Sequence, residues 1–169
     1  MRPAAVQNNG PRNHRWSTPM YPRILVPMDG SDTANRGLVE AIRLAHGHPS
    51  ELVLLHVIDD FPTMRQFASN EPLDAQRAQR RAAAQELLAH GVKLAQASRV
   101  KATTEVCFAI ESAPDSIIET AGRTGCGLIV IGTHGRSGVR RAVLGSVAEA
   151  VSRRSVVPVL LVPPHPAAA

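Results

Sequence analysis

Short apolar runs recur along the chain, and longer segments of helical character separate them. Five of these runs predict strands, over residues 23–28, 51–59, 100–108, 127–131 and 158–162. Most of them are apolar without alternation, which is typical of strands that helices cover on both faces. The run over 100–108 instead alternates between apolar and polar residues, which indicates a strand near the edge of a sheet.

Helices are predicted in the segments between these strands. Ser31 or Asp32 can cap a helix that follows the first strand, because each offers a side-chain oxygen to the free amides of a first turn. Further helices are expected over residues 73–97, from Pro114 onward and over residues 146–154. Residues 60–72 contain two prolines and predict a loop.

The alternation of strand and helix predicts an α/β fold with a single open five-stranded parallel sheet and helices on both faces. Ligands of such folds bind at the carboxyl ends of the strands where the strand order reverses. Two strands end in small and polar residues, the first in a segment that begins at Asp29 and the fourth in one that begins at Gly132. If these strands are neighbours, the order is 3-2-1-4-5 and the site lies between them.

The length and composition suit one domain, expected over residues 21–164. A chain of 169 residues can bury a core, which must consist of aliphatic residues because the aromatic content is 3%. Cys107 and Cys126 are too few for a disulfide framework, so a reducing, cytoplasmic compartment is the simpler interpretation. No apolar run is long enough to cross a bilayer, so no membrane association is expected.

The ends of the chain differ from the rest in composition. Residues 1–20 lack acidic side chains and apolar periodicity, which predicts a disordered leader, with an organelle transit peptide as the alternative. Residues 165–169 form a short tail. Three arginines of the leader account for much of the net charge of +5, and the remainder is only weakly basic. With so few aromatics to stack bases, the sequence does not favour a nucleic-acid partner.

The segment Gly132-Thr-His-Gly135 carries the strongest chemical signal, because Gly145-Ser146 follows it after nine residues. Glycines let backbone amides approach a phosphate, and the start of a helix favours an anion. We therefore expect a phosphate-binding loop, and we expect Gly132→Val or Gly145→Val to abolish binding while the fold survives. The alternative is that these glycines only form a turn and a helix start.

Three segments of the sequence are similar to one known family. GLIVIGTHGRSGVRRAVLGSVAEAVSRRSVVPVLLVP resembles the carboxyl-terminal signature of universal stress proteins, and RILVPMDGSDTA and LVLLHVID resemble their first two strands. The resemblance runs from about residue 21 to residue 163. The pattern G-x2-G-x9-G-[ST] resembles the branch of the family that binds ATP.

This resemblance implies an adenine nucleotide as ligand, in the form of ATP with Mg²⁺ or Mn²⁺. Asp29 would lie near the ribose or the phosphate-bound metal, which it would contact only indirectly, and Val57 would meet adenine through its backbone. The residues implied at the site are Pro27, Asp29, Val57, Ile131, Gly132, Gly135, Arg136, Gly145, Ser146 and Val147.

The last strand, over residues 158–162, is expected at a sheet edge in the order 3-2-1-4-5. Its unpaired N–H and C=O groups are a template for another strand, and Pro158 and Pro163 limit its length. We therefore predict a homodimer formed through this strand, and the family resemblance implies the same.

The predicted function is that of a stress-response regulatory protein that responds to nucleotide occupancy. One alternative is a slow ATPase or a nucleotidyl- or phosphotransfer enzyme, and another is a basic, nucleic-acid-associated stress factor. The glycine loop lacks a Walker lysine, and no paired carboxylates or water-activating base accompany it in the sequence, so we do not predict an enzyme. The sequence does not decide between ATP, AMP and a cyclic adenine nucleotide.

Overall fold

The computed structural model describes residues 19–59, 72–109, 111–134 and 144–164. Its strands are β1 (Arg23–Pro27), β2 (Glu51–Ile58), β3 (Lys101–Phe108), β4 (Leu128–Gly132) and β5 (Val159–Val162). Its helices are α1 (Asp32–Ala45), α3 (Leu73–Ala97), α4 (Ala113–Arg123) and α5 (Ser146–Arg154). Nearly all of the predicted leader, the tail and most of the predicted loop over 60–72 lie outside the described residues.

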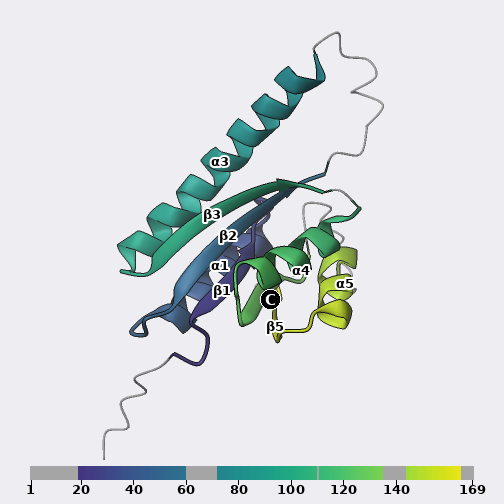
Figure 1. Cartoon of the computed structure of the whole chain (residues 1–169). Helices are drawn as coiled ribbons and strands as arrows, with labels where there is room; N and C mark the ends of the chain where they lie inside the picture. Colours follow the sequence, from purple (N-terminus) through teal and green to yellow (C-terminus); the bar gives the residue numbers. More distant parts are fainter. Residues whose placement is uncertain (1–18, 60–71, 110, 135–143, 165–169) are drawn as a thin grey trace, which may run out of the picture.

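The five strands form one parallel sheet in the order β3-β2-β1-β4-β5, as the sequence predicts (Figure 1). β2 and β3 lie in sequence order on one side of β1, whereas β4 and β5 lie on its other side. The strand order therefore reverses between β1 and β4, and the carboxyl ends of these two strands diverge into separate loops.

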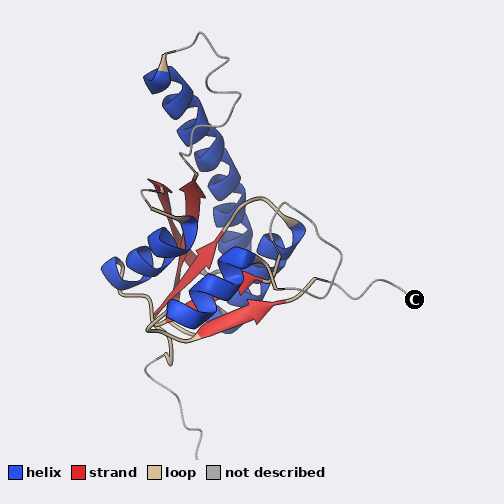
Figure 2. Cartoon of the chain, turned by 90° about the vertical axis from the view of Figure 1, so that its right-hand side faces the viewer, coloured by secondary structure: helices blue, strands red, loops and turns tan. Residues whose placement is uncertain are grey.

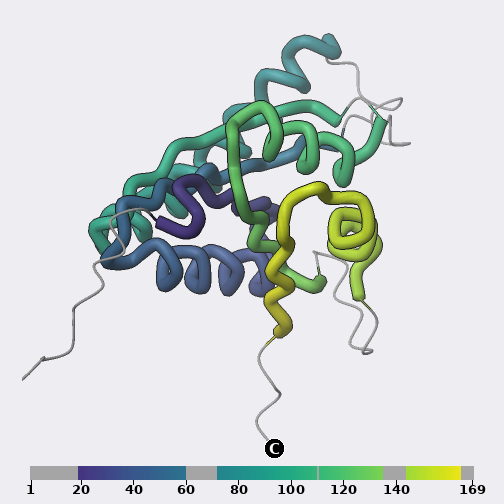
Figure 3. Tube along the Cα trace, turned by 60° about the horizontal axis from the view of Figure 1, so that its bottom comes forward, coloured from purple at the N-terminus to yellow at the C-terminus, as the bar shows by residue number. Residues whose placement is uncertain are grey.

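Helices cover both faces of the sheet (Figures 2 and 3). Each face has its own apolar core. Leu52 and Leu54 of β2 belong to the core beneath α1 and α3. Val53 and Leu55 of the same strand belong to the core beneath α4 and α5. The alternation follows from the strand geometry, which turns successive side chains to opposite faces.

Two of the helices begin with a serine cap. Ser31 caps α1, its Oγ accepting a hydrogen bond from the Ala34 N–H at 3.2 Å, and this is one of the two caps predicted from the sequence. Ser112 caps α4 in the same way, accepting from the Asp115 N–H at 3.4 Å. Both serines satisfy an amide that the helix itself leaves without a partner.

Helix α3 is longer than the sheet on which it packs, and Figure 1 shows it running on beyond the strands. Its buried residues begin near its middle, at Ala84, and continue with Leu88, Gly91 and Ala95. Its first half is attached through arginines: the guanidinium carbons of Arg77 and Arg81 lie 5.6 and 5.3 Å from the centroid of the Phe108 ring. These cation–π contacts connect the helix to the end of β3.

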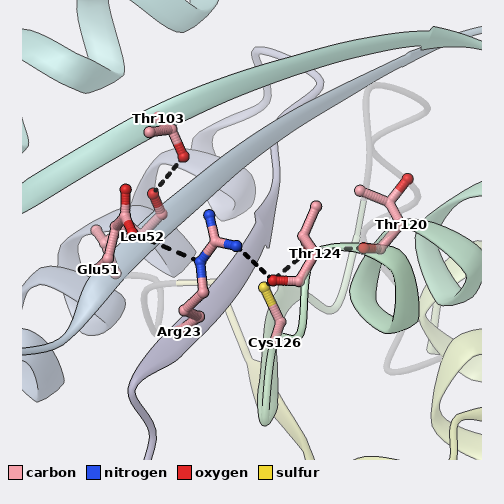
Figure 4. A network of polar contacts seen from close by, with 7 residues as sticks. All are labelled: Arg23, Glu51, Leu52, Thr103, Thr120, Thr124 and Cys126. Carbon is pink, nitrogen blue, oxygen red and sulfur yellow. Dashed lines mark hydrogen bonds and ion pairs between the residues drawn. The ribbon is translucent and has the colours of Figure 1, made fainter.

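At the amino edge of the sheet, a polar network joins the starts of β1 and β2 to the turn between α4 and β4 (Figure 4). The Arg23 Nε lies 3.5 Å from the Glu51 carboxylate, and its Nη1 donates to the Thr124 carbonyl at 2.5 Å. The Thr124 hydroxyl in turn donates to the Thr120 carbonyl at 2.6 Å. This network stabilises the side of the sheet where the strands begin, opposite to the side where they end.

Candidate functional site

A pocket lies at the carboxyl edge of the sheet, between the ends of β1 and β4. Its walls come from the ends of β1, β2 and β4 and from the first turns of α1, α4 and α5. The described lining residues are Pro27, Met28, Asp29, Ala34, Leu55, Val57, Ala113, Ile117, Ile131, Gly132, Thr133, His134, Gly145, Ser146, Val147 and Ala148. The pocket therefore occupies the point where the strand order reverses, as the sequence predicts for the site.

Every predicted site residue that the structure describes lines this pocket. These residues are Pro27, Asp29, Val57, Ile131, Gly132, Gly145, Ser146 and Val147. Gly135 and Arg136 lie outside the described residues. The structure thus brings together the first strand, the second strand and the glycine loop, and the first of these lies more than 100 residues before the last.

One wall of the pocket is apolar. Leu55 and Val57 of β2, Ile131 of β4, and Ala113 and Ile117 of α4 form it together. Ala113 and Ile117 are four residues apart, so they lie on the same face of α4. Such a wall can hold a flat apolar ring system, since burial of apolar surface stabilises the bound group.

Asp29 is the acidic residue among the described lining residues. Its Oδ1 accepts a hydrogen bond from the Ser31 N–H at 2.9 Å, which fixes the carboxylate at the turn after β1. Asp29 therefore closes the turn and lines the pocket at the same time. A carboxylate held in this way can accept hydrogen bonds from hydroxyl groups of a ligand.

The two glycines of the predicted phosphate loop are required for packing within the protein. A Cβ at Gly132 would lie 2.7 Å from the Thr33 carbonyl carbon and 2.9 Å from the Ala34 nitrogen. A Cβ at Gly145 would lie 2.9 Å from the Thr133 carbonyl oxygen. We therefore no longer expect the fold to survive Gly132→Val unharmed, and a valine at either glycine does not isolate phosphate binding from folding.

Thr133 and His134 connect the end of β4 to its neighbours. The Thr133 carbonyl accepts from the Gly145 N–H at 2.8 Å, which anchors the residue before α5. The Thr33 hydroxyl donates to the His134 carbonyl. The His134 Nδ1 lies 2.9 Å from the Thr133 Oγ1. His134 also lines the pocket.

The helices that border the pocket differ at their amino ends. At α4 the pKa of Asp115 is lowered, first by the Ser112 hydroxyl and then by the Arg154 guanidinium, so this helix start already holds a carboxylate. Helix α1 carries Asp32 in its first turn, and Ser31 caps it. Helix α5 begins after Gly145 without a side-chain cap from the described residues.

The sequence did not identify several lining residues. They are Met28, Ala34, Leu55, Ala113, Ile117, Thr133, His134 and Ala148. Four of them, Met28, Thr133, His134 and Ala148, are direct neighbours of predicted residues, and this proximity was a usable signal. Ala113 and Ile117 carry no such signal, because their part in the site depends on how α4 crosses the sheet.

The cysteine next to the pocket is a packing residue. Cys107 pairs with Val57 in the register of β2 and β3 and packs in the core beneath α4. Burial raises the pKa of its thiol, which disfavours the reactive thiolate.

Within the described part of the chain, no group of three His, Cys, Asp or Glu side chains could hold a metal ion. No helix in the described ranges is long and apolar enough to span a membrane.

The sheet order and the pocket at its reversal point define a Rossmann-like α/β protein. The sequence profile of the universal stress protein family matches residues 20–163. The chain belongs to this family.

Its similarity to individual proteins agrees with that assignment. A relative, "Universal stress protein MJ0531" of Methanocaldococcus jannaschii, is 33% identical over 145 residues, covering 85% of this chain and 82% of the relative. The solved structure of hypothetical protein MJ0577 matches with a TM-score of 0.75 at 28% identity, over 86% of this chain and 97% of that one.

Two further solved structures share the fold at lower identity. A universal stress protein in complex with cAMP has a TM-score of 0.63 and 23% identity, over 84% of this chain and 97% of that one. The universal stress protein from Archaeoglobus fulgidus in complex with dAMP has a TM-score of 0.59 and 20% identity, over 86% and 99%.

Proposed function

We propose that this chain binds ATP together with Mg²⁺ or Mn²⁺ in the pocket between β1 and β4, and that it acts as a regulatory stress protein. The observation that carries the proposal is the difference among the helices around the pocket. Serines cap α1 and α4, whereas the glycine before α5 supplies no side-chain oxygen. The start of α5, which no side chain of the described residues caps, lies at the pocket and suits a phosphate.

The first-turn amides of α5 supply the phosphate contacts in this proposal. The first hydrogen bond within the helix is donated by the Glu149 N–H to the Gly145 carbonyl at 2.9 Å. The N–H groups of Ser146, Val147 and Ala148 precede that bond and have no partner within the helix. All three residues line the pocket, and the Ser146 hydroxyl adds a further donor.

The rest of the pocket fits the other parts of an adenine nucleotide. The apolar wall with Leu55, Val57 and Ile117 takes the adenine ring, and the Asp29 carboxylate accepts hydrogen bonds from the ribose or reaches the phosphate-bound cation. Structures of the same fold in complex with cAMP and dAMP are consistent with an adenine nucleotide as ligand.

A regulatory role is proposed over an enzymatic one because of the groups at the pocket. Asp29 and His134 are the titratable side chains among its described lining residues. One oxygen of Asp29 accepts from Ser31, and His134 Nδ1 contacts Thr133. Both contacts are with neighbouring residues of the same turn, and neither a lysine nor a second carboxylate belongs to the described lining residues.

Nucleotide binding is tested by denaturing the purified protein and identifying any nucleotide released, followed by titration with ATP, AMP and cAMP in the presence of Mg²⁺. We expect ATP to bind most tightly, because its phosphates extend to the amides of α5. Hydrolysis should be negligible, far below the roughly 10 per second of an ordinary enzyme. A multiple-turnover rate in that range that is lost in Asp29→Ala would show that the protein is an enzyme.

We also propose that two copies pair along β5. This strand lies at one edge of the sheet. The Pro158 carbonyl accepts a hydrogen bond from β4, and the Val162 carbonyl accepts one from Thr133, just after β4. In a parallel ladder the residues between them, Val159 and Leu161, turn their N–H and C=O groups toward the open edge. These groups are available to a second copy of the strand.

Apolar side chains along this edge are consistent with the same pairing. Leu160 is 38% exposed, and Val156, just before the strand, is 92% exposed. Leu160→Lys places a charge on the edge without removing a ladder hydrogen bond, so we expect the dimer to dissociate while the protein stays folded. Leu94→Lys on α3, where the leucine is 41% exposed, is the matched control and should remain dimeric.

The oligomeric state is measured by light scattering at micromolar concentration, together with circular dichroism of each variant. A monomeric wild type, or a Leu160→Lys variant that is still a dimer, would count against pairing through β5.

A further inference from the structure

The geometry points to Thr33 as a positioning residue for the phosphate end of the pocket. Thr33 does not line the pocket, and it is buried with 6% of its surface exposed. It lies in the first turn of α1, between the end of β1 and the end of β4. The inference rests on the proposed function, because it concerns the same bound nucleotide.

Hydrogen bonds around Thr33 have a defined direction. The Thr33 hydroxyl donates to the His134 carbonyl, since a carbonyl can only accept. The Ser31 hydroxyl lies 3.2 Å from the Thr33 Oγ1 and must be the donor of that pair, because the Thr33 proton is already used. The Ser31 N–H donates to Asp29. A continuous chain of hydrogen bonds therefore joins Asp29 to His134, two residues of the pocket.

The same chain continues to the start of α5. The residue before His134, Thr133, accepts from the Gly145 N–H at 2.8 Å, and Gly145 is the N-cap of α5. The position of the His134 carbonyl therefore affects where the helix that carries the phosphate-binding amides begins. The missing Cβ of Gly132 lets the Thr33 backbone lie directly against this segment, so the contact is tight as well as polar.

Loss of the Thr33 hydroxyl has a specific consequence. The part-buried His134 carbonyl loses its side-chain donor. The segment that holds Gly145 then has more freedom, and the amides of α5 are no longer fixed before a ligand arrives. The apolar wall, formed by β2, β4 and α4, does not depend on this bond, and Asp29 is held by the Ser31 backbone N–H rather than by a hydroxyl. Thr33 should therefore affect the binding of phosphates and leave adenosine binding unchanged.

The test compares Thr33→Val, Thr33→Ala and Thr33→Ser with wild type. Dissociation constants are measured for ATP with Mg²⁺ and for adenosine. We expect ATP to bind about tenfold more weakly to the valine and alanine variants, as loss of one part-buried hydrogen bond implies, with adenosine binding changed less than twofold. The serine variant keeps the hydroxyl and should bind ATP as wild type does. Valine replaces the hydroxyl with a methyl group that faces the His134 carbonyl. Alanine is included because it removes the hydroxyl without adding a methyl group there.

Thr124→Val is the matched control. It removes another threonine hydroxyl that donates to a backbone carbonyl, that of Thr120, at the opposite edge of the sheet. This variant should change the ratio of the dissociation constants for ATP and adenosine by less than twofold, even if it lowers Tm. If the wild type binds ATP but the ratio of the dissociation constants for ATP and adenosine is unchanged in Thr33→Val and Thr33→Ala, the role of Thr33 is wrong and the proposed function still stands. A wild type that binds no adenine nucleotide overturns the proposed function and this inference with it.

Discussion

Gly132→Ala is expected to destabilise the protein by about 3 kcal/mol, a large effect for the addition of one methyl group. The new Cβ would lie 2.7 Å from the Thr33 carbonyl carbon and 2.8 Å from its oxygen. These are backbone atoms at the start of a packed helix, so they cannot move aside as a flexible side chain would. For a chain of this size the loss corresponds to a fall of roughly 10 °C in Tm, measured by circular dichroism.

Gly122→Ala is the control for this result. Gly122 lies in α4, and a Cβ there would have no heavy atom within 4 Å. Alanine has the higher helix propensity, so this variant should be as stable as wild type or slightly more stable. If Gly132→Ala melted with the wild type as well, α1 could not pack against the end of β4 as the structure describes.

Val147→Asp is expected to weaken ATP binding by about 100-fold without destabilising the fold. Val147 lines the pocket in the first turn of α5 and is 37% exposed, so the new carboxylate needs no burial. A negative charge in a first turn is favourable for the helix, but it repels the phosphates. Two unit charges about 6 Å apart near a protein surface repel by roughly 3 kcal/mol, which corresponds to about 100-fold in affinity.

Val147→Asn separates charge from shape, because it has the size of aspartate without its charge. We expect it to bind ATP within about fivefold of wild type, and we expect adenosine to bind all three proteins alike. Calorimetric titration with both ligands measures these differences. Equal ATP affinities for Val147→Asp and Val147→Asn would mean that the phosphates lie away from α5.

The sequence predicted the fold because the relevant signals are local. Strands covered on both faces read as continuous apolar runs, and the alternation over residues 100–108 correctly marked β3 as an edge strand. The strand order depended on one further observation, that polar segments follow β1 and β4. Parallel strands place their carboxyl ends at one edge, so these segments had to meet if the two strands were neighbours.

The parts of the site that sequence could not predict depend on tertiary packing. Thr33 resembles any polar residue in a first helical turn, and its partner His134 is 101 residues away. Ile117 became a wall residue through the path of α4 over β2 and β4, which periodicity does not determine. The sequence showed that a side chain is absent at Gly132, and only the structure showed that the Thr33 backbone fills that space.

The uneven burial of α3 has a consequence for how the domain opens. Residues 73–83 include no buried side chain, whereas Leu88 is fully covered in the core. Separation of the first three turns exposes little apolar surface, so its free energy is much smaller than that of global unfolding. Amide protons of this segment should therefore exchange with solvent through local fraying, whereas those around Leu88 are released only when the sheet beneath them is disrupted.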